Sequence, residues 1–561
     1  MQDDFSNQYN GSQTGGSYQI NGETYQVDVD YAPPKKSGCG GYGCLFGCGV
    51  GCLVLIIIMA VSSLLVYFYC IKGVPMQVSP ETTLITSPLK SDGKSVDFFA
   101  VIKEKTEPQD STKKNGFKDV LAAYGKDLIA DGKQNELNHG WIFSELCKSF
   151  GLDPNFVPPH TYKEPKLAEF IPHKNKNENE NEEDEVEAVL DNEYELTVFK
   201  KVLSKNWSIK EYPNLEEWLG KVDSGLDVVQ KAAMEEFYFI PMVRRNENEL
   251  AAMPILPVVV ANEKLAYGLQ VRSMLRIGEG KFGKAWDDLL ASIRLQRNFI
   301  GKGIYAVNPR SDQVKLQIVK TVAESSSRWT PEQLTKAVAD LETIPPNPKR
   351  EDLLLVVQYI LLDAFSMAGN SQQFVESISG QPIESHPTGK ELKGLVSLMQ
   401  LCGFNWNKVA KKFNEAVANH KKTINDADAE KILNLTNKDM KFEFDKFADK
   451  LSDQLQHKIA DMFSVSGRSE IVGFIAGEYV PVLERYIFKQ TINDEIHCRL
   501  LQTVFAIEKY KSEHKKYPDS LDQLKLNPPK ISAITTIYEP TNKGYKISIS
   551  DVELEIKPNT P

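Results

Sequence analysis

Residues 269–292 read LQVRSMLRIGEGKFGKAWDDLLAS, which is the pattern of two helices joined by a tight turn. Apolar and small side chains recur at helical spacing on both sides of the turn at Gly278–Gly280. Small residues at Ser273, Ala285 and Ser292 would let the two helices approach closely, with aromatic side chains filling the groove between them. We therefore expect a helical hairpin here.

The turn also matches the spacing of a phosphate-binding loop, with Gly278, Gly283 and Lys284 at the positions of its two glycines and its lysine. Ala285 follows where that loop carries the hydroxyl that holds Mg²⁺, and the preceding segment has a helical pattern where a strand is required. We therefore predict that no nucleotide binds here. The hairpin is instead similar to a tetratricopeptide unit. No second copy occurs at a fixed period, so the similarity covers one hairpin and not an array.

The hairpin lies within residues 190–490, which have a helical pattern almost throughout. Thr330-Pro331-Glu332-Gln333 is a start signal, with a hydroxyl cap, a proline at the first helical position and a glutamine three residues after the cap. Asn214, with Glu217 three residues later, is expected to cap another helix. Apolar stripes mark the buried faces: Leu215, Trp218, Leu219, Val222, Leu226 and Val229; Leu353, Val357, Ile360, Leu361 and Ala364; Phe444, Phe447, Leu451, Leu455, Ile459 and Met462.

Residues 45–71 contain no charged side chain and no His, Asn, Gln or Pro. As a helix this segment would be about 40 Å long, which exceeds the ~30 Å hydrocarbon layer of a bilayer. It follows 44 residues that are mainly polar, and it has no small-residue cleavage site. The sequence therefore predicts one uncleaved transmembrane signal-anchor helix.

The orientation of this helix follows from the flanking charges. Lys35 and Lys36 precede it and Lys72 follows it, so the positive-inside bias places the N-terminus in the cytoplasm. Residues 72–561 are then periplasmic or otherwise extracytoplasmic. Four cysteines crowd the N-terminal edge of this segment: Cys39, Cys44, Cys48 and Cys52. Three readings stay open, namely acylation sites, part of a helix-packing face, or incidental thiols in a small-residue entry to the membrane.

Composition changes along the chain suggest six regions. Residues 173–189 are acidic and Asn/Glu-rich, with too few apolar residues to fold alone. Three β-prone runs near the C-terminus predict a small antiparallel sheet after a helix: Ile534–Tyr538, Tyr545–Ile549 and Val552–Ile556. The predicted regions are a flexible cytoplasmic tail (1–44), the transmembrane helix (45–71), a mixed ectodomain region (72–172), an acidic linker or loop (173–189), an α-helical domain (190–490) and a C-terminal α+β module (491–561). The expected fold class is therefore mainly α.

Composition also excludes some functions and leaves no recognisable catalytic site. A net charge of −10 over 561 residues argues against a general nucleic-acid-binding protein. The eight cysteines do not form a disulfide framework, although a bridge among Cys147, Cys402 and Cys498 stays open. Neither of two possible metal-binding motifs is convincing. His497 and Cys498 are adjacent, so on a helix they point to different faces and could not easily bind one metal ion. Residues Asp426–Glu430 resemble half of a calcium loop but lack its glycine. We therefore expect no metal and no cofactor, and we assign no catalytic residue; whether the chain is an enzyme stays open.

Three segments together resemble a group of membrane-anchored envelope proteins of planctomycete-type bacteria. They are ETTLITSPL at 81–89 with the residues up to Phe99, SMLRIGEG through AWDDLL at 273–290, and LETIPP at 341–346. The resemblance spans roughly residues 80–370 and implies a single anchor and a helical domain, with no activity or functional residue attached. Residues 499–524, ending YPDSLDQL, are similar to the segment after the helix in type II secretion pseudopilins. The processing signal of those proteins is absent here, so this likeness implies a fold fragment only.

These features favour an envelope-facing, membrane-tethered interaction or scaffold protein. Its partners would be the lipid bilayer, through residues 45–71, and another envelope protein. Two alternatives stay open: a membrane-tethered hydrolase built from carboxylates and histidines, and a component associated with secretion. A deep cleft holding carboxylates of perturbed pKa would favour the hydrolase, whereas a shallow apolar groove would favour binding.

Overall fold

The computed structural model describes residues 17–20, 23–26, 72–107, 114–129, 136–162, 202, 206–247, 249–250, 256–300, 310–368, 403–424, 431–432, 464–527, 534–541, 544–549 and 552–556. Several predicted features lie outside these ranges: the transmembrane helix at 45–71, the cysteines beside it, the acidic segment at 173–189, residues 426–430, the stripe from Phe444 to Met462, and Cys402. Within the described ranges, no helix combines the length and the apolar character needed to cross a bilayer. The chain divides into two compact units, Met1–Leu65 and Val66–Pro561.

The first unit contains a two-stranded antiparallel hairpin. β1 (Ser17–Ile20) pairs with β2 (Glu23–Gln26), so that Tyr18 lies opposite Tyr25. The Asn-Gly dipeptide that follows β1 in the sequence is a strong short-range signal for such a hairpin. Two strands bury little apolar surface, so a hairpin of this size is marginally stable in water.

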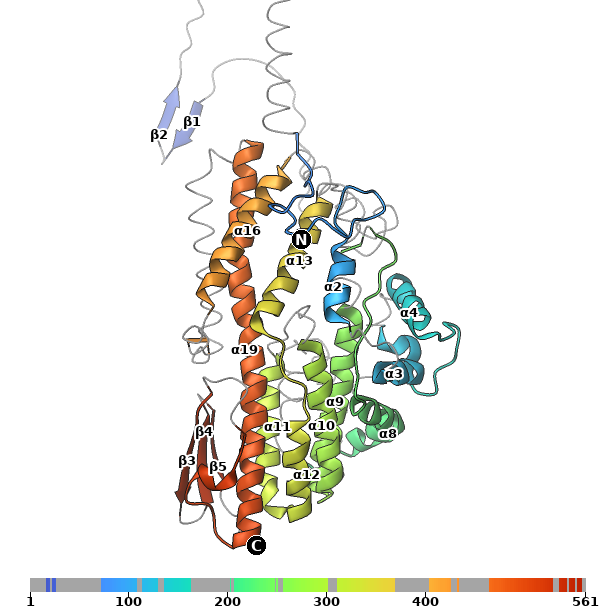
Figure 1. Ribbon diagram of the computed structural model, residues 1–561, viewed down its shortest axis with the longest axis vertical. Coiled ribbons are helices and arrows are strands. Elements are labelled where there is room, and N and C mark those ends of the chain that lie inside the picture. The colour runs from blue at the N-terminus through green and yellow to red at the C-terminus, as the bar shows by residue number, and fades with distance from the viewer. Residues whose placement is uncertain are drawn as a thin grey trace, which may run out of the picture. The chain divides into compact units, whose positions relative to one another are not determined.

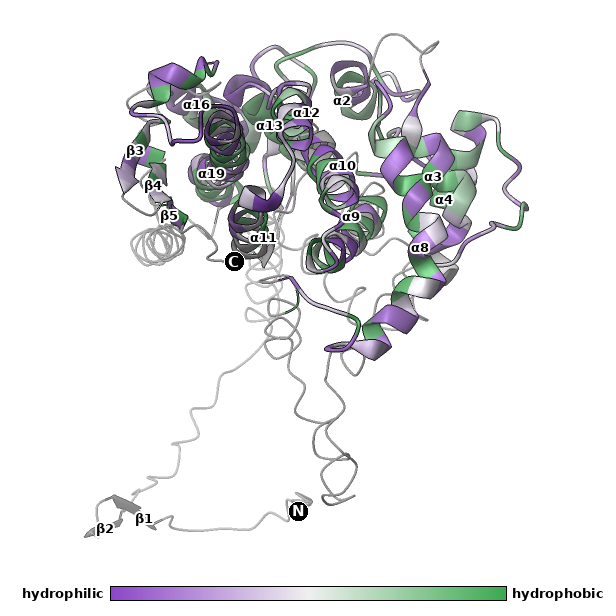
Figure 2. Cartoon of the chain, turned by 90° about the horizontal axis from the view of Figure 1, so that it is seen from below, coloured by the Kyte–Doolittle hydropathy of each residue, from purple (hydrophilic) through white to green (hydrophobic). Residues whose placement is uncertain are grey.

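The second unit is mainly helical, as predicted (Figure 1). Its principal helices are α2 (Phe98–Thr106), α3 (Gly116–Tyr124), α4 (Glu136–Phe150), α8 (Pro213–Ala233), α9 (Leu256–Gly278), α10 (Phe282–Ile300), α11 (Arg310–Ser325), α12 (Pro331–Glu342), α13 (Arg350–Ala368), α16 (Trp406–Thr423) and α19 (Val465–His514). Figure 2 shows hydrophobic and hydrophilic residues on each of α8, α9 and α10, as expected of amphipathic helices packed around a core.

Of the two helix starts expected from capping signals, one is observed and the other is not. α12 begins at Pro331 with the predicted capping box, in which the side chains of Thr330 and Gln333 each accept a hydrogen bond from the other's backbone N–H. α8 begins at Pro213, so the expectation that Asn214 caps it is wrong. Proline has its φ fixed near the helical value and no N–H to satisfy, which favours it at the first helical position and moves the start ahead of the asparagine.

α19 is a helix of 50 residues to which much of the second unit is attached. It packs against α16 along its first half and against α11 and α12 along its second half (Figure 1). The helix passes without a break through residues 490 and 491, where the sequence suggested a boundary. The central helices and the C-terminal segment therefore share one continuous element.

The C-terminal residues form the small antiparallel sheet that the sequence predicted. Its strands are β3 (Thr536–Thr541), β4 (Gly544–Ile549) and β5 (Val552–Ile556), in the order β3-β4-β5. Alternate residues of β4 and β5 are buried: Tyr545, Ile547, Ile549, Val552, Leu554 and Ile556. The sheet contacts α19 through β4 and α11 through β5, so one face lies on the core of the helical unit.

Three aromatic rings pack together where the second half of α19 meets α10 and Trp329, the residue that follows the short turn after α11. Phe505 of α19 stacks on Trp329 with ring centroids 5.0 Å apart, and its ring lies edge-on to Trp286 of α10 at 5.2 Å. Truncating a large buried aromatic side chain typically costs about 3–5 kcal/mol. Leu289 of α10 and Leu501 of α19 lie one helical turn away from Trp286 and Phe505, and both line the cavity that these helices enclose.

Candidate functional site

α9 and α10 form the predicted helical hairpin. The connecting turn closes onto α9, because the Lys281 N–H donates to the Arg276 carbonyl at 2.8 Å, and Gly280 has a φ of 72° that favours glycine. Across the two helices, Ser273 Oγ donates to the Ala285 carbonyl at 2.9 Å. The turn is thus entered from a helix, and its geometry differs from the strand–loop–helix arrangement that holds a phosphate.

A network of ion pairs joins the hairpin to α8. Arg272 of α9 donates to Asp288 at 2.6 Å, to Asp223 at 2.7 Å and to Asp227 at 2.8 Å, and Arg276 donates to Asp288 at 2.6 Å. Burial alone lowers the pKa of Arg272, but the attraction of Asp288 and Asp223 outweighs burial and raises it. Each of these carboxylates is engaged by an arginine, so the network holds three helices together and offers no carboxylate pair for acid–base chemistry.

A second buried cluster pins α13, α16 and α19 to one another. Arg350 Nη2 donates to Glu484 at 2.8 Å, and His420 Nε2 lies 3.1 Å from the same carboxylate. Burial alone raises the pKa of Glu484, but the hydrogen bonds from Arg350 and His420 lower it below its usual value. The carboxylate therefore stays charged inside the protein as the common partner of two helices.

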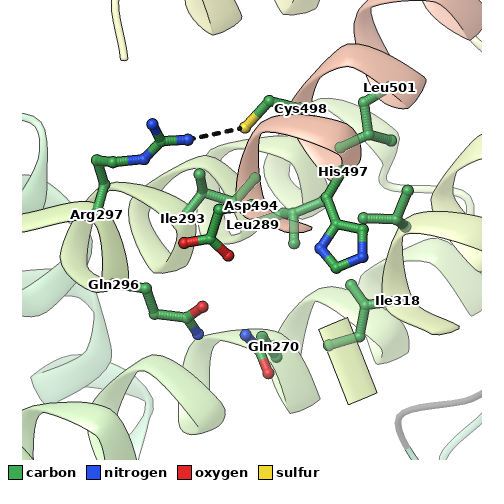
Figure 3. Close-up of a pocket in the computed structure, with 11 residues that line it drawn as sticks. Gln270, Leu289, Ile293, Gln296, Arg297, Ile318, Asp494, His497, Cys498 and Leu501 are labelled. Atoms are coloured by element: carbon green, nitrogen blue, oxygen red, sulfur yellow. Dashed lines mark hydrogen bonds between the residues drawn. The ribbon is translucent and has the colours of Figure 1, made fainter. Parts of the chain in front are cut away.

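A small cavity lies between α9, α10, α11 and α19 (Figure 3). Its volume of about 30 Å³ is room for about two water molecules. Apolar side chains of α10, α11 and α19 form part of the wall. The polar side chains that line it are Gln270, Gln296, Arg297, Asp494, His497 and Cys498. The cavity is therefore small, and its wall is mainly apolar with polar atoms at a few places.

Arg297 of α10 and Cys498 of α19 meet at this cavity. Arg297 Nη2 donates to Cys498 Sγ at 3.6 Å, and Nη1 lies 3.6 Å from Glu495 (Figure 3). Burial alone lowers the pKa of Arg297, which is 3% exposed, but the attraction of Cys498, Asp494 and Glu495 outweighs burial and raises it. The guanidinium is thus a fixed positive charge beside the sulfur. Both Cys147 and Cys498 carry thiols, so they do not bridge to each other.

Gln270 leaves a hydrogen-bonding group of the cavity unsatisfied. Its side chain is 3% exposed, and its Nε2 donates to Ser292 Oγ at 2.9 Å. Its Oε1 is buried without a hydrogen-bond partner among the described residues, and the same holds for Nε of Arg297. A buried polar atom left unpaired costs about 1–3 kcal/mol, so each of these two atoms lowers the local stability of the packing around the cavity.

The cavity is lined by two residues that the sequence analysis singled out, His497 and Cys498, and by others that it did not. His497 and Cys498 both line the cavity, and Figure 3 shows the imidazole and the thiol on different sides of α19, as adjacent helix positions require. Within the described ranges, no group of three His, Cys, Asp or Glu side chains is placed to hold a metal ion. The sequence analysis did not identify Gln270 or Arg297 as candidate site residues. The available signal was that Arg297 follows Leu289 and Ile293 on the apolar stripe of α10.

Comparison of the chain with protein-family models, with curated proteins and with solved structures finds no match. The chemistry of the cavity therefore has to be judged from its geometry. Pockets that bind drug-sized ligands or cofactors typically measure about 300–1,000 Å³. A cavity of about 30 Å³ accepts water-sized molecules and excludes sugars, peptides and nucleotides.

Proposed function

We propose that the chain is a single-pass, membrane-anchored scaffold protein of the cell envelope. Residues 45–71 would anchor it, the N-terminus would lie in the cytoplasm, and the helical second unit would present a surface to another envelope protein. The tetratricopeptide-like hairpin α9–α10 would stiffen that surface, because its ion network and aromatic contacts tie it to α8 and α19. The fold class and the pairing of the buried carboxylates support this proposal.

The observation that carries the proposal is the attachment of the chain just after the predicted membrane segment. Val74 accepts a hydrogen bond from the Trp406 N–H at 2.9 Å and donates one to the Phe404 carbonyl at 2.7 Å. Asn414 of α16 donates to the Thr82 carbonyl at 3.0 Å. These bonds fix the first residues of the unit to the start and the body of α16. The segment that follows the predicted anchor is thus packed on α16, which would keep the surface of the unit attached to a membrane tether.

The hydrolase alternative has weaker support. The carboxylates of both buried clusters are paired with arginines, and the cavity beside His497 and Asp494 is too small for an organic substrate. A binding surface needs neither a deep cleft nor an unpaired carboxylate. The geometry therefore favours the scaffold.

Crosslinking in native membranes tests the scaffold proposal. A photoreactive amino acid is placed at Tyr479 on α19 or Ile537 on β3, which are 37% and 58% exposed, and at Val157, which is 89% exposed, as the comparison position. A partner covers a defined patch, so we expect one envelope protein to be captured reproducibly from some positions and not from others. Capture of no reproducible protein from any position, or equal capture of many proteins from all three, would contradict the proposal.

A further inference from the structure

Glu508 is a buried carboxyl at the contact between α19 and the C-terminal sheet. Its side chain is 3% exposed, and its Oε1 has no hydrogen-bond partner among the described residues. Tyr545 of β4 is its neighbour across the contact, but the hydroxyl of that tyrosine falls short of hydrogen-bond geometry. A carboxyl in such a place is costly to ionise, because burial removes the water that would stabilise the charge.

The groups around Glu508 compensate its charge only in part. Lys511 of α19 places Nζ 3.8 Å from Glu508 Oε2, but the same ammonium donates to the Tyr517 hydroxyl at 2.6 Å. The Lys511 side chain is 32% exposed, so water screens its attraction. From β3, the Tyr538 hydroxyl donates to a backbone carbonyl at 2.8 Å, and β5 adds apolar side chains to the buried face. Burial therefore outweighs these neighbours and raises the pKa of Glu508.

The same contact holds the sheet on the helices. Tyr545 is fully buried, and its ring packs edge-on against Tyr517 with centroids 5.1 Å apart. The sheet lies beside the second half of α19, with β4 in contact with α19 and β5 in contact with α11 (Figure 1). A charge on Glu508 would thus form next to the side chain that attaches β4. Moving the sheet away would let water reach the carboxylate, so the charged form favours the open arrangement.

We propose that the C-terminal sheet is a pH-sensitive latch on α19, closed while Glu508 is neutral and loosened when Glu508 ionises. In the open state water solvates the carboxylate, so the open state binds the proton less tightly than the closed state does. The closed state is favoured fully below the ordinary pKa of 4.5, and this advantage is lost as the pH rises through the higher pKa of the closed state. Opening would uncover the apolar faces of β4 and β5. The latch does not depend on the scaffold proposal.

Hydrogen exchange of the full chain in lipid nanodiscs tests the latch. Exchange of β4 and β5 is measured at about pH 5 and about pH 8 and divided by the rates of the same peptides unfolded, which gives protection factors. We expect protection to fall at least about threefold between these pH values, as it would if the closed state binds the proton about tenfold more tightly than the open state. Glu484 does not contribute, because its lowered pKa leaves it charged throughout this range.

Three variants assign the effect. Glu508→Gln imitates the neutral carboxyl, so its protection should be the same at both pH values and should exceed that of the wild type at the higher one. Glu513→Gln is the matched control, because Glu513 is on the same end of α19, is 48% exposed and pairs with Lys509. His514→Gln tests the imidazole that stacks on Tyr510, since imidazoles also ionise in this pH range. Both controls should keep the wild-type pH dependence.

Two results in the unmodified chain would overturn the proposal: protection of β4 and β5 that is the same at the two pH values, or protection that increases with pH. A wild-type pH dependence in Glu508→Gln would overturn it as well. If Glu508→Gln does not fold, the wild type and His514→Gln still decide. A dependence that disappears in His514→Gln would belong to the imidazole and not to the buried carboxyl.

Discussion

Glu484 is a buried carboxylate whose neighbours make its charge essential to the fold. Glu484→Gln keeps the shape of the side chain but removes the negative charge that faces the buried Arg350 guanidinium. Removing one partner of a buried ion pair costs about 3–5 kcal/mol, and we expect a loss of that order in the free energy of unfolding, measured by urea denaturation. The control is Glu217→Gln on α8, whose pair with Lys221 is exposed and should contribute little. Equal effects of the two changes would contradict the buried pairing.

The lowered pKa of Glu484 predicts how the free energy of unfolding depends on pH. The hydrogen bonds from Arg350 and His420 hold the pKa of Glu484 in the folded protein below its ordinary value of 4.5. Such a group stabilises the fold above its unfolded pKa, and this contribution is lost as the pH falls through the folded pKa. The free energy of unfolding should therefore fall less steeply below about pH 4.5 in Glu484→Gln than in the wild type. Denaturation curves from neutral pH downward measure the two slopes, and identical slopes would exclude this role.

At the scale of elements, the contact between α16 and α19 depends on two glycines of α19. A Cβ added at Gly473 would lie 2.8 Å from the Val409 carbonyl oxygen, and one added at Gly477 would overlap the Cβ of Ala416. Alanine favours a helix over glycine by about 1 kcal/mol, so Gly477→Ala would be stabilising if the helices stood apart. We expect instead a loss of about 1–3 kcal/mol, because the helices must separate. Urea denaturation monitored by circular dichroism measures the change.

A matched control for this contact lies on α8. An added Cβ at Gly220 meets no atom within 4 Å, so Gly220→Ala should raise the free energy of unfolding by up to about 1 kcal/mol. Opposite signs for the two substitutions are the expected result. Stabilisation by both would show that α16 and α19 do not approach closely at Gly477.

The elements with strong local signals were predictable from the sequence. The cap at Thr330 and the β-prone runs at Tyr545–Ile549 and Val552–Ile556 depend on neighbouring residues only, and both are observed. The length of α19 was not predictable in this way. Pro481 lies inside it and removes a backbone donor, which by local rules favours a kink or an end. Packing on both halves of the helix overrides that preference, and packing is not visible in a local window.

At the scale of the whole molecule, periodicity predicted the mainly helical unit and its C-terminal sheet, but not which faces meet. The contact between Arg297 and Cys498 joins residues 201 positions apart. Periodicity places each of them on a helix face without saying which two faces share a cavity. The candidate site was therefore beyond sequence reasoning, apart from the pair His497 and Cys498. The transmembrane helix, its orientation and the envelope partner stay predictions.

The continuity of α19 changes how the C-terminal segment should be tested. Removing residues 491–561, the region suggested by the sequence, would cut this helix, whereas removing 515–561 leaves it whole and takes away the sheet. The buried faces of β4 and β5 lie on α19 and α11, so their loss exposes the core there. We expect amide hydrogen exchange in α11 and the second half of α19 to become at least about tenfold faster, which corresponds to about 1.4 kcal/mol of local stability. The contact of α16 with the first half of α19 is the internal control and should exchange at its former rate. Unchanged exchange throughout would mean that the sheet is an independent appendage, and faster exchange everywhere would mean that the unit unfolds as one cooperative body.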